Sequence, residues 1–471
     1  MRKWIWQRRC RPDFEMDKAF FSSKKVLVMG LGRFGGGVDV VKFACRAGAN
    51  VTVTDLLSAE QLKKSLGQLE GFEDIEYHLG EHLEEDFSES DIVVVNPAVF
   101  PDNRFISLAR SRGKSVTSQV EIFFSACPAR IIGITGANGK STTAALTAHL
   151  LKNARYENVW LSGNIGNEPM LTSLEQIKAD DLVVLELSSF QLEQLANIKK
   201  TPFAALLTNL TPNHLDRHKR FENYCSAKEN IFRFQELDEG RPAVSVFNAE
   251  DKISAEWFEK YNKEPGRLCI KYSADDVDAE IAERFRLPGR ANLSNLAGAL
   301  AIAKYFGVDT ERIKTALPDF KPLPHRLELI AEIDGVRWYN DSISTTPESA
   351  ISALEAFEEP KIIIAGGYDK NLPFDELGKI IAQKAKSVIL IGQTAEKIAE
   401  SVKTATEVTE NTETIKIEIV HSLSEVVKLA HNIAVKGDVV LFSPGCASYD
   451  MFDNFQHRGN EFAKLVHQIS T

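Results

Sequence analysis

The chain has 471 residues. A single hydrophobic core stops growing at roughly 250–300 residues, so we expect several domains. Its formal net charge of −10 argues against a general nucleic-acid-binding protein, which would carry basic clusters. Six cysteines without a CxxC pair or zinc-ligand spacing fit a reducing compartment better than a disulfide framework, so we expect a cytoplasmic protein. No apolar stretch is long enough to cross a bilayer.

Residues 1–24 form an N-terminal arm to which we assign no function. Its basic residues are not followed by the apolar core and cleavage site of a signal peptide. The arm could contact a membrane surface, but a disordered tail, or a start assigned too early with Met16 as the true start, accounts for it equally well.

The first module begins with a strand, a glycine-rich turn, a helix and a second strand, read from KVLVMGLGRFGGG and NVTVTD. The glycines let the turn approach a ligand, and an acid at the end of the second strand can reach a sugar hydroxyl. Taken alone, this pattern indicates a nicotinamide dinucleotide site at Gly30, Gly32, Gly35 and Asp55. Another strand is expected over residues 91–96, and the module closes near residue 128.

The middle module opens on IIGITGANGKSTT, an apolar strand that runs into a glycine-rich turn and a helix start. Bare backbone N–H groups of such a turn cradle phosphate, a lysine adds positive charge and a hydroxyl reaches Mg²⁺. Gly136 and Gly139 have two residues between them where the common phosphate loop has four, so the loop is a short variant. Lys140, Ser141 and Thr142 follow it, and we predict an ATP site.

Further apolar strands are expected over residues 181–189, 203–209 and 243–251, and then over 336–341, 361–367, 387–392, 415–420 and 438–445. Helical patterns separate them, which favours parallel sheets covered by helices on both faces. Pro322 and Pro324 make a stiff connection between the two sets. We therefore predict an α/β protein with three domains: a Rossmann-like domain over 1–128, an ATPase-like domain over 129–322 and a Rossmann-like domain over 323–471.

Polar residues that follow predicted strands are candidates for chemistry. Glu186 ends the run DLVVLE, where a carboxylate can bind Mg²⁺ or can be an ordinary acid at a strand end. His214 follows the next strand in TPNHLDRH. Nothing in the local sequence distinguishes Lys228, Arg326 or Lys370 from solvated side chains.

In chain order, the segments ITGANGKSTT, GNIG, LELSSFQLE, NLTPNHLDRH, PHRLE, YNDS, AGGYDK and SPGCASYDMFDNFQHRGNEF closely resemble the Mur ligases of peptidoglycan synthesis. The resemblance runs from about residue 25 to the C-terminus and is strongest to the D-glutamate-adding member. It implies a ligase that couples ATP cleavage to addition of D-glutamate to UDP-N-acetylmuramoyl-L-alanine through an acyl phosphate, in a cytoplasmic monomer. It also replaces the dinucleotide interpretation of the first module, because that module holds UDP in this family.

The resemblance assigns residues to ATP and to two Mg²⁺ ions. The implied nucleotide contacts are Gly136, Asn138, Gly139, Lys140, Ser141, Thr142, Asn292, Arg326 and Asp341. The implied catalytic residues are Lys140, Asn164, Glu186, His214 and Lys228. Metal contacts are implied for Ser141, Thr142, Glu186, His214 and Lys228, the last as a carbamate, since carbamylation turns an amine of pKa about 10.4 into an anion.

The resemblance also implies two substrate sites. The UDP-substrate positions are Gly30, Gly32, Gly35, Asp55 and Asn96. The D-glutamate positions are Thr345, Lys370, Ser448 and Phe455. Two features depart from the family pattern: Ile343 replaces a lysine found in many members, and the run from Gly35 to Gly37 is unusually rich in glycine.

Three alternatives stay open. A related amide ligase would add a different amino acid to a UDP-sugar, or glutamate to folate, although a folate enzyme would lack the module before the phosphate loop. An NAD-binding oxidoreductase would leave the ATP loop unexplained. A nucleotide-gated binding protein without catalysis would not need the lysine, acid and histidine.

Overall fold

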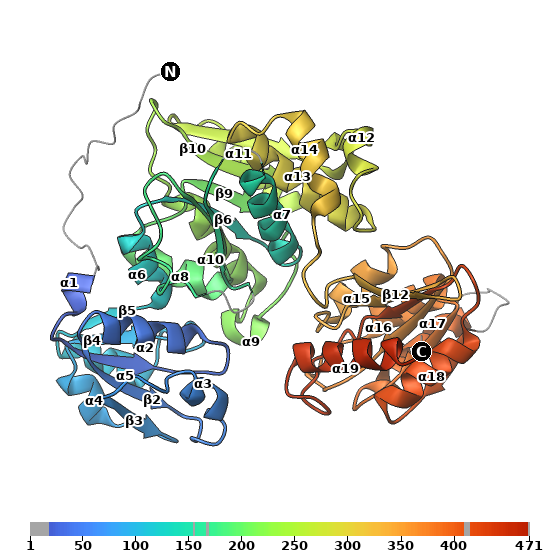
Figure 1. The fold of residues 1–471 in the computed structure, drawn as a ribbon, viewed down its shortest axis with the longest axis horizontal. Helices are drawn as coiled ribbons and strands as arrows, with labels where there is room; N and C mark the ends of the chain where they lie inside the picture. Colours follow the sequence, from blue (N-terminus) through green and yellow to red (C-terminus); the bar gives the residue numbers. More distant parts are fainter. Residues whose placement is uncertain (1–17, 154–155, 166–168, 409–414, 470–471) are drawn as a thin grey trace. The chain divides into compact units, whose positions relative to one another are not determined.

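The computed structural model describes residues 18–153, 156–165, 169–408 and 415–469 (Figure 1). The chain divides into two compact units, the first made of residues 1–272 and 298–310 and the second of 273–297 and 311–471. Three separate sheets surrounded by helices confirm the predicted α/β class. The domain boundaries at residues 128 and 322 stay predictions, and most of the expected arm lies outside the described residues.

The N-terminal sheet of the first unit has five parallel strands in the order β3-β2-β1-β4-β5. Its strands are β1 (Lys25–Met29), β2 (Asn50–Asp55), β3 (Ile75–Leu79), β4 (Ile92–Val95) and β5 (Ser115–Thr117). Its helices are α1 (Lys18–Phe21), α2 (Gly36–Arg46), α3 (Lys63–Gly67), α4 (Glu84–Glu89), α5 (Arg104–Ser111) and α6 (Gln119–Ala126).

Strand β1 shows why this sheet is covered on both faces. Val26 and Val28 belong to one apolar cluster, and Leu27 and Met29 belong to another. Successive side chains of a strand point to opposite faces, so a continuous apolar strand needs a core on each side. Helices therefore pack on both faces and leave the carboxyl edge of the sheet for the glycine-rich turn.

The central sheet, also in the first unit, has six parallel strands in the order β11-β10-β9-β6-β8-β7. Its strands are β6 (Arg130–Thr135), β7 (Val159–Gly163), β8 (Leu182–Glu186), β9 (Ala204–Leu207), β10 (Ala243–Asn248) and β11 (Arg267–Tyr272). The helices that follow are α7 (Lys140–Lys152), α8 (Ser189–Ile198), α9 (Leu215–His218), α10 (Phe221–Arg233), α11 (Lys252–Tyr261), α12 (Ala279–Ala282), α13 (Arg290–Tyr305) and α14 (Thr310–Ala316). Short 3-10 helices lie at Ala274–Asp276 and Leu317–Asp319.

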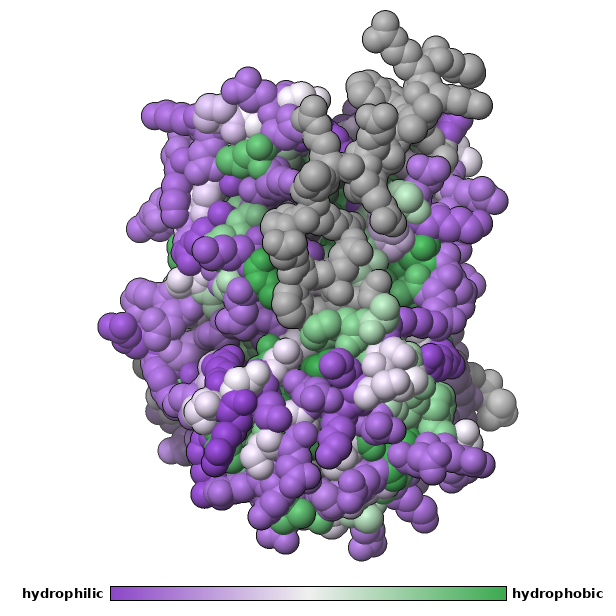
Figure 2. Space-filling view, turned by 90° about the vertical axis from the view of Figure 1, so that its left-hand side faces the viewer, coloured by the Kyte–Doolittle hydropathy of each residue, from purple (hydrophilic) through white to green (hydrophobic). Residues whose placement is uncertain are grey.

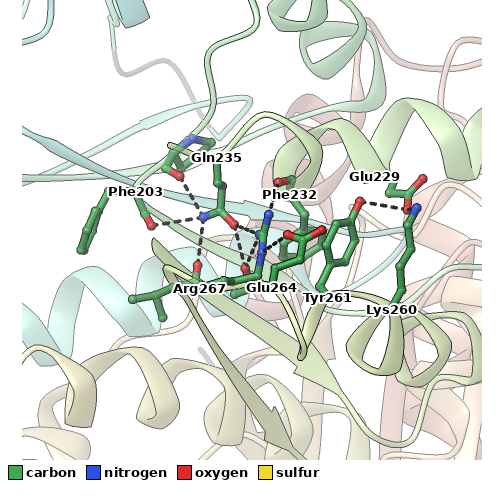
Figure 3. Close-up of polar contacts among 11 residues, drawn as sticks. Phe203, Glu229, Phe232, Gln235, Lys260, Tyr261, Glu264 and Arg267 are labelled. Carbon is green, nitrogen blue, oxygen red and sulfur yellow. Dashed lines mark hydrogen bonds and ion pairs between the residues drawn. The ribbon is translucent and has the colours of Figure 1, made fainter. Parts of the chain in front are cut away.

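A buried polar network built on Gln235 joins the residues just before β9 to β10 and β11 (Figure 3). The Gln235 Nε2 atom donates to the carbonyl oxygens of Pro202, Phe203 and Val244 at 3.0, 3.1 and 3.0 Å. Its Oε1 atom accepts from Ser245 Oγ and Arg267 Nη1. The amide therefore has partners on both its nitrogen and its oxygen, as a structural buried polar group requires.

The sheet of the second unit has six strands in the order β12-β13-β17-β14-β15-β16. Strand β12 runs antiparallel to β13, and all other neighbours are parallel. The strands are β12 (Glu328–Ile333), β13 (Val336–Asn340), β14 (Lys361–Ala365), β15 (Ser387–Leu390), β16 (Lys416–Ile419) and β17 (Val439–Phe442). The helices are α15 (Pro347–Leu354), α16 (Asp375–Lys384), α17 (Ala395–Val408), α18 (Leu423–Ile433) and α19 (Phe455–His467).

This second sheet is also doubly wound. Leu441 of β17 shares an apolar cluster with residues of α15, α16 and α17, whereas Val440 shares one with residues of α18 and α19. Parallel strands covered in this way present their carboxyl ends and the loops that follow them at one edge.

Hydrophilic residues cover most of the face drawn in Figure 2, with hydrophobic residues between them in small areas. Within the described residues, no helix combines the length and the apolar character that crossing a bilayer requires.

Candidate functional site

The phosphate loop links β6 to α7 and is held by residues at the end of β9. Thr208 Oγ1 donates to the carbonyl oxygen of Asn138 at 2.6 Å, and Asn209 Oδ1 accepts from the Asn138 backbone N–H at 2.9 Å. A Cβ atom at Gly136 would lie 1.8 Å from Thr208 Oγ1, so only glycine fits there. Gly139 adopts φ +79° directly before α7, and the first N–H groups of that helix have no partner within the helix.

Lys140 and Thr142 occupy the first turn of α7. Lys140 Nζ folds back over the loop and donates to the Ala137 carbonyl oxygen at 2.7 Å. Thr142 is 2% exposed, and its Oγ1 atom has no hydrogen-bond partner among the described residues. An orphaned buried hydroxyl beside a lysine and a helix N-terminus is suited to a phosphate–metal complex.

Glu186 ends β8 beside Asn164, which follows β7. Asn164 Nδ2 donates to Glu186 Oε1 at 3.1 Å, and the Asn164 backbone N–H donates to the Glu186 carbonyl oxygen at 2.9 Å. The second carboxylate oxygen, Oε2, is buried without a partner in the part of the chain that the structure describes. A Cβ atom at Gly163 would lie 2.3 Å from the Glu186 carbonyl oxygen, so this close approach requires glycine. Gly166, the last residue of the GNIG motif, lies outside the described residues.

Lys228 lies on α10 and is 2% exposed. Its Nζ atom donates to Thr135 Oγ1 at 3.1 Å and lies 4.9 Å from the centre of the Tyr224 ring. Burial lowers the pKa of this amine well below its ordinary value, and the positive charge of Lys140 lowers it further, while Glu186 acts in the opposite direction. The structure thus brings Lys228, Lys140 and Glu186 into one electrostatic neighbourhood.

Two histidines flank Phe190 near this neighbourhood. His214 precedes α9 with φ +53°, and its ring lies 5.1 Å from that of Phe190 and 6.4 Å from that of Tyr224. His218 is buried and forms a 2.9 Å hydrogen bond with Ser189 Oγ. The sequence patterns singled out His214 and missed His218, because a histidine inside a short helix carries no local signal.

The glycine-rich turn of the N-terminal sheet is closed by two predicted site residues. Asp55 Oδ2 accepts from the Gly32 backbone N–H at 2.9 Å, and Asn96 Nδ2 donates to the Gly30 carbonyl oxygen at 3.1 Å. A small cavity of about 10 Å³ at this edge is lined by Gly30, Gly36, Asn96 and Gln119 among others. Gly35, with φ +86°, directly precedes α2 at the same turn.

Arg326 and Asp341 lie close together in the second unit. Asp341 Oδ2 accepts from Ser443 Oγ at 2.8 Å, and its Oδ1 accepts from the Leu327 backbone N–H at 3.1 Å. Burial raises the pKa of Asp341 to about 6, although the Ser443 hydrogen bond and the positive charge of Arg326 lower it. The Arg326 Nε atom is buried without a hydrogen-bond partner in the described chain. Asn292, also in this unit, donates through Nδ2 to the Pro288 carbonyl oxygen.

Three of the four predicted D-glutamate positions lie in loops that follow neighbouring strands, and the fourth begins a helix. Thr345 follows β13, Lys370 follows β14, Ser448 follows β17, and Phe455 begins α19. Lys370 is exposed and Ser448 is buried. Because β13, β17 and β14 are neighbours, these loops share one carboxyl edge.

Arg458 of α19 organises these loops, and the sequence patterns did not identify it. It is 3% exposed, its Nη2 atom donates to the Ser342 carbonyl oxygen at 2.7 Å, and its Nη1 atom donates to those of Cys446 and Ala447 at 3.0 and 3.2 Å. Burial lowers the pKa of Arg458 to about 10.

Comparisons with known proteins find relatives along most of the chain. Three family profiles cover successive parts of the chain: the MurD-like N-terminal domain of Mur ligases over residues 24–118, the Mur ligase middle domain over 134–286 and the Mur ligase glutamate ligase domain over 325–446. The chain is 40% identical over 465 residues to UDP-N-acetylmuramoylalanine--D-glutamate ligase of Acetivibrio thermocellus, which covers 96% of this chain and 98% of that protein.

Further relatives agree in length. The corresponding protein of Roseiflexus sp. is 37% identical, with 95% of this chain and 99% of that protein covered. Among solved structures, MurF from Acinetobacter baumannii matches with a TM-score of 0.58 at 15% identity, over 96% of this chain and 92% of that one. A pseudomurein peptide ligase type C from Methanothermus fervidus matches with a TM-score of 0.53 at 17% identity, over 95% of this chain and 100% of that one. At such identities the structural matches support the fold.

Proposed function

Because this chain belongs to the Mur ligase family, we propose that it joins the amino group of D-glutamate to the carboxyl group of UDP-N-acetylmuramoyl-L-alanine, with cleavage of ATP to ADP and phosphate. The observation that carries this function is the near-complete alignment, at 40% identity, to a ligase named for that reaction. The protein is an ATP-dependent, amide-bond-forming ligase of peptidoglycan precursor synthesis, and we place it in the cytoplasm as a monomer.

We place the triphosphate of ATP at residues 136–139 and the first turn of α7. Lys140 would offset negative charge on the phosphates, and the N–H groups at the start of α7 would donate to their oxygens. Asn292, Arg326 and Asp341 are proposed as further nucleotide contacts, supported by the family resemblance of the segments that hold them.

Magnesium fits the same edge of the central sheet. Thr142 Oγ1 and Glu186 Oε2 are buried oxygens without partners among the described residues, and Mg²⁺ prefers oxygen ligands. Ser141, Thr142 and Glu186 would hold one ion, and His214 and Lys228 would contribute to a second. A bound ion supplies positive charge that offsets the charge developing on the transferred phosphoryl group.

Carbamylation of Lys228 is consistent with its surroundings. Burial favours the neutral amine, which is the form that adds to carbon dioxide. The resulting carbamate is an anion with two oxygens, and it would gain from the positive charge of Lys140. A lysine that is otherwise costly to bury would then serve as an anionic ligand.

The reaction proceeds in two displacements. A carboxylate oxygen of the UDP-linked substrate attacks the γ-phosphorus of ATP, which breaks the bond to ADP and leaves an acyl phosphate. The amine of D-glutamate then attacks the acyl carbon, loses a proton and expels phosphate through a tetrahedral intermediate. The contribution of Lys140 and of the loop N–H groups is to hold the phosphates in line and to balance their charge, while Asn164 orients Glu186.

The second unit would bind D-glutamate. Lys370 supplies positive charge for a substrate carboxylate, and the hydroxyl groups of Thr345 and Ser448 supply donors. Phe455 begins α19 beside them. The domain boundaries that we propose, at residues 128 and 322, separate the UDP-binding, ATP-binding and D-glutamate-binding parts.

The test is an assay of phosphate release from ATP in the presence of Mg²⁺ and UDP-N-acetylmuramoyl-L-alanine. D-glutamate should support release and formation of the new amide, whereas L-glutamate, L-alanine and diaminopimelate should not. Release supported by one of those amino acids and not by D-glutamate would contradict the substrate and retain the ligase class. Absence of release with every amino acid would contradict both.

A further inference from the structure

Asp39 is a buried acid on α2, the helix that the glycine-rich turn opens, and its side chain is bound by another part of the first unit. The residue is 4% exposed. Its Oδ2 atom accepts from the backbone N–H groups of Met170 and Leu171 at 2.9 and 2.7 Å, and its Oδ1 atom accepts from that of Thr172 at 3.0 Å. Three successive N–H groups of the segment between β7 and β8 therefore converge on one carboxylate.

The chemistry of this contact is specific for a carboxylate. An ionised carboxyl group only accepts hydrogen bonds, so it can face several N–H donors at once. Consecutive backbone N–H groups that point to one place form a site for an anion. The bonds are charge-assisted and shielded from water, which makes them stronger than bonds between neutral groups.

Gln119 extends the contact into the cavity of the N-terminal sheet. Its Nε2 atom donates to Asp39 Oδ2 at 2.7 Å, which turns its Oε1 atom toward Gly36. A Cβ atom at Gly36 would lie 3.4 Å from that oxygen. The side chain of Gln119 lines the same cavity as Gly30 and Asn96.

The unusual glycine run now has a physical explanation. A Cβ atom at Gly37 would lie 2.3 Å from the Leu31 carbonyl oxygen, so α2 packs directly on the glycine-rich turn. Gly36 leaves room for the Gln119 amide, and Asp39 follows one turn later on the same helix. The glycines thus allow α2 to pack against the turn and against Gln119. Asp39 binds α2 to residues 170–172 through hydrogen bonds.

An apolar cluster and a second acid support the same contact. Met170 and Leu171 are buried in the apolar cluster that contains Val38 and Val40 of α2. Glu121 of α6 accepts from Asn197 Nδ2 of α8 at 3.1 Å, so another carboxylate of the N-terminal region bonds to the central region. These contacts are independent of Asp39 and should preserve folding when Asp39 is replaced.

We propose that Asp39 is a positioning residue that fixes the glycine-rich turn of the N-terminal sheet relative to the ATP-binding sheet, through residues 170–172 on one side and Gln119 on the other. This inference rests on the proposed function, because it requires the glycine-rich turn to bind the UDP end of the substrate. The carboxyl group that attacks ATP is carried by that substrate. Its alignment with the phosphate loop therefore depends on how firmly the two parts are joined.

The experiment compares Asp39→Asn with the full-length parent. Asparagine keeps the size of the side chain but puts an N–H group where an acceptor is needed. We expect the KM for UDP-N-acetylmuramoyl-L-alanine to rise roughly tenfold and kcat to fall, with the KM for ATP changed by less than about twofold. Amide hydrogen exchange at residues 170–172 should become roughly tenfold faster or more.

Two other variants separate positioning from loss of stability. Asp91→Asn is the matched control, because Asp91 is exposed and its carboxylate accepts a hydrogen bond from the Lys25 backbone N–H at 3.0 Å. It should leave the KM values and the exchange at 170–172 unchanged. Gln119→Ala should raise the KM for the UDP substrate without faster exchange at 170–172, and combining it with Asp39→Asn should add little further change in KM.

The outcomes distinguish the two levels of inference. If Asp39→Asn leaves either the exchange at 170–172 or the KM for the UDP substrate unchanged, the positioning role is wrong. If Asp39→Asn does not fold, Gln119→Ala still decides, since an unchanged KM in that variant also contradicts the proposal. If the parent protein makes no amide, the proposed function fails, while the exchange measurement still reports whether Asp39 holds residues 170–172.

Discussion

Two buried polar clusters of the central region differ in how completely their hydrogen bonds are made. In the network of Figure 3, the Gln235 amide nitrogen donates to three carbonyl oxygens and the amide oxygen accepts from Ser245 and Arg267. In the phosphate-loop cluster, Thr142 Oγ1 and Glu186 Oε2 are equally buried but have no partner among the described residues.

The difference separates a structural role from a binding role. A buried polar group without a partner costs roughly 1–3 kcal/mol, so it persists only where something else compensates. The Gln235 network needs nothing beyond the chain itself. In the phosphate-loop cluster, the proposed ATP and Mg²⁺ would supply the missing bonds.

The largest effect is expected from Lys140→Ala. Removing this charge should lower the rate of ATP-dependent phosphate release by a factor on the order of 10² or more, by analogy with loss of one preorganised charge-stabilising donor. Lys152→Ala is the control, because Lys152 is an exposed residue in the last turn of the same helix and should leave the rate unchanged. Steady-state kinetics decide the matter, and a near-normal rate for Lys140→Ala would refute its role.

A second variant tests the structural role of the Gln235 network. Gln235→Ala should leave kcat within about twofold of the parent. It should lower the free energy of unfolding by about 2–3 kcal/mol, because it leaves buried carbonyl, hydroxyl and guanidinium groups without a hydrogen-bond partner. Denaturation with urea measures the loss. Gln68→Ala, at an exposed position, should cost less than about 0.5 kcal/mol. A tenfold loss of kcat with unchanged stability would contradict the structural role of Gln235.

The smallest effect concerns Asp341, where both carboxylate oxygens have partners and burial still raises the pKa to about 6. Because the pKa is higher in the folded state than its ordinary value of 3.8, the folded state holds its proton more firmly, and stability from this group is lost as the pH rises from about 4 to 6. Asp341→Asn removes this dependence. The free energy of unfolding of Asp341→Asn minus that of the parent should therefore increase by about 1–2 kcal/mol between pH 4 and pH 6. Urea denaturation at several pH values measures this difference. An unchanged difference would show that burial does not perturb Asp341.

The strands that the sequence predicted and those that it missed differ in position. Every interior strand was expected from its apolar run, as in β1, β8 and β14. The unpredicted strands β3, β5, β7, β11 and β12 all lie at sheet edges, where only one neighbour pairs and side chains stay partly exposed. Of the edge strands, β16 alone was predicted, from the apolar run over residues 415–420.

The candidate site divides in a similar way. The phosphate loop, Glu186 and His214 follow strands and could be located from sequence, whereas Lys228 and Arg326 needed the family resemblance because their local sequences resemble ordinary surface segments. Thr208, Asn209 and Arg458 escaped notice, because their contacts join residues about 70 or more than 100 positions apart. Asp39 was hidden for the same reason, since its side chain bonds to Gln119, 80 positions away, and to residues 170–172, more than 130 positions away.

Arg458 has a consequence for the order in which the protein matures on the ribosome. The guanidinium that ties down the carbonyl oxygens of Ser342, Cys446 and Ala447 belongs to α19, which emerges after every strand of its sheet. Domains fold largely as units during synthesis, so the first unit can fold while these loops still lack the hydrogen bonds from Arg458. A nascent chain halted before α19 would thus contain a folded phosphate loop, while the loops proposed to bind D-glutamate would lack the hydrogen bonds from Arg458.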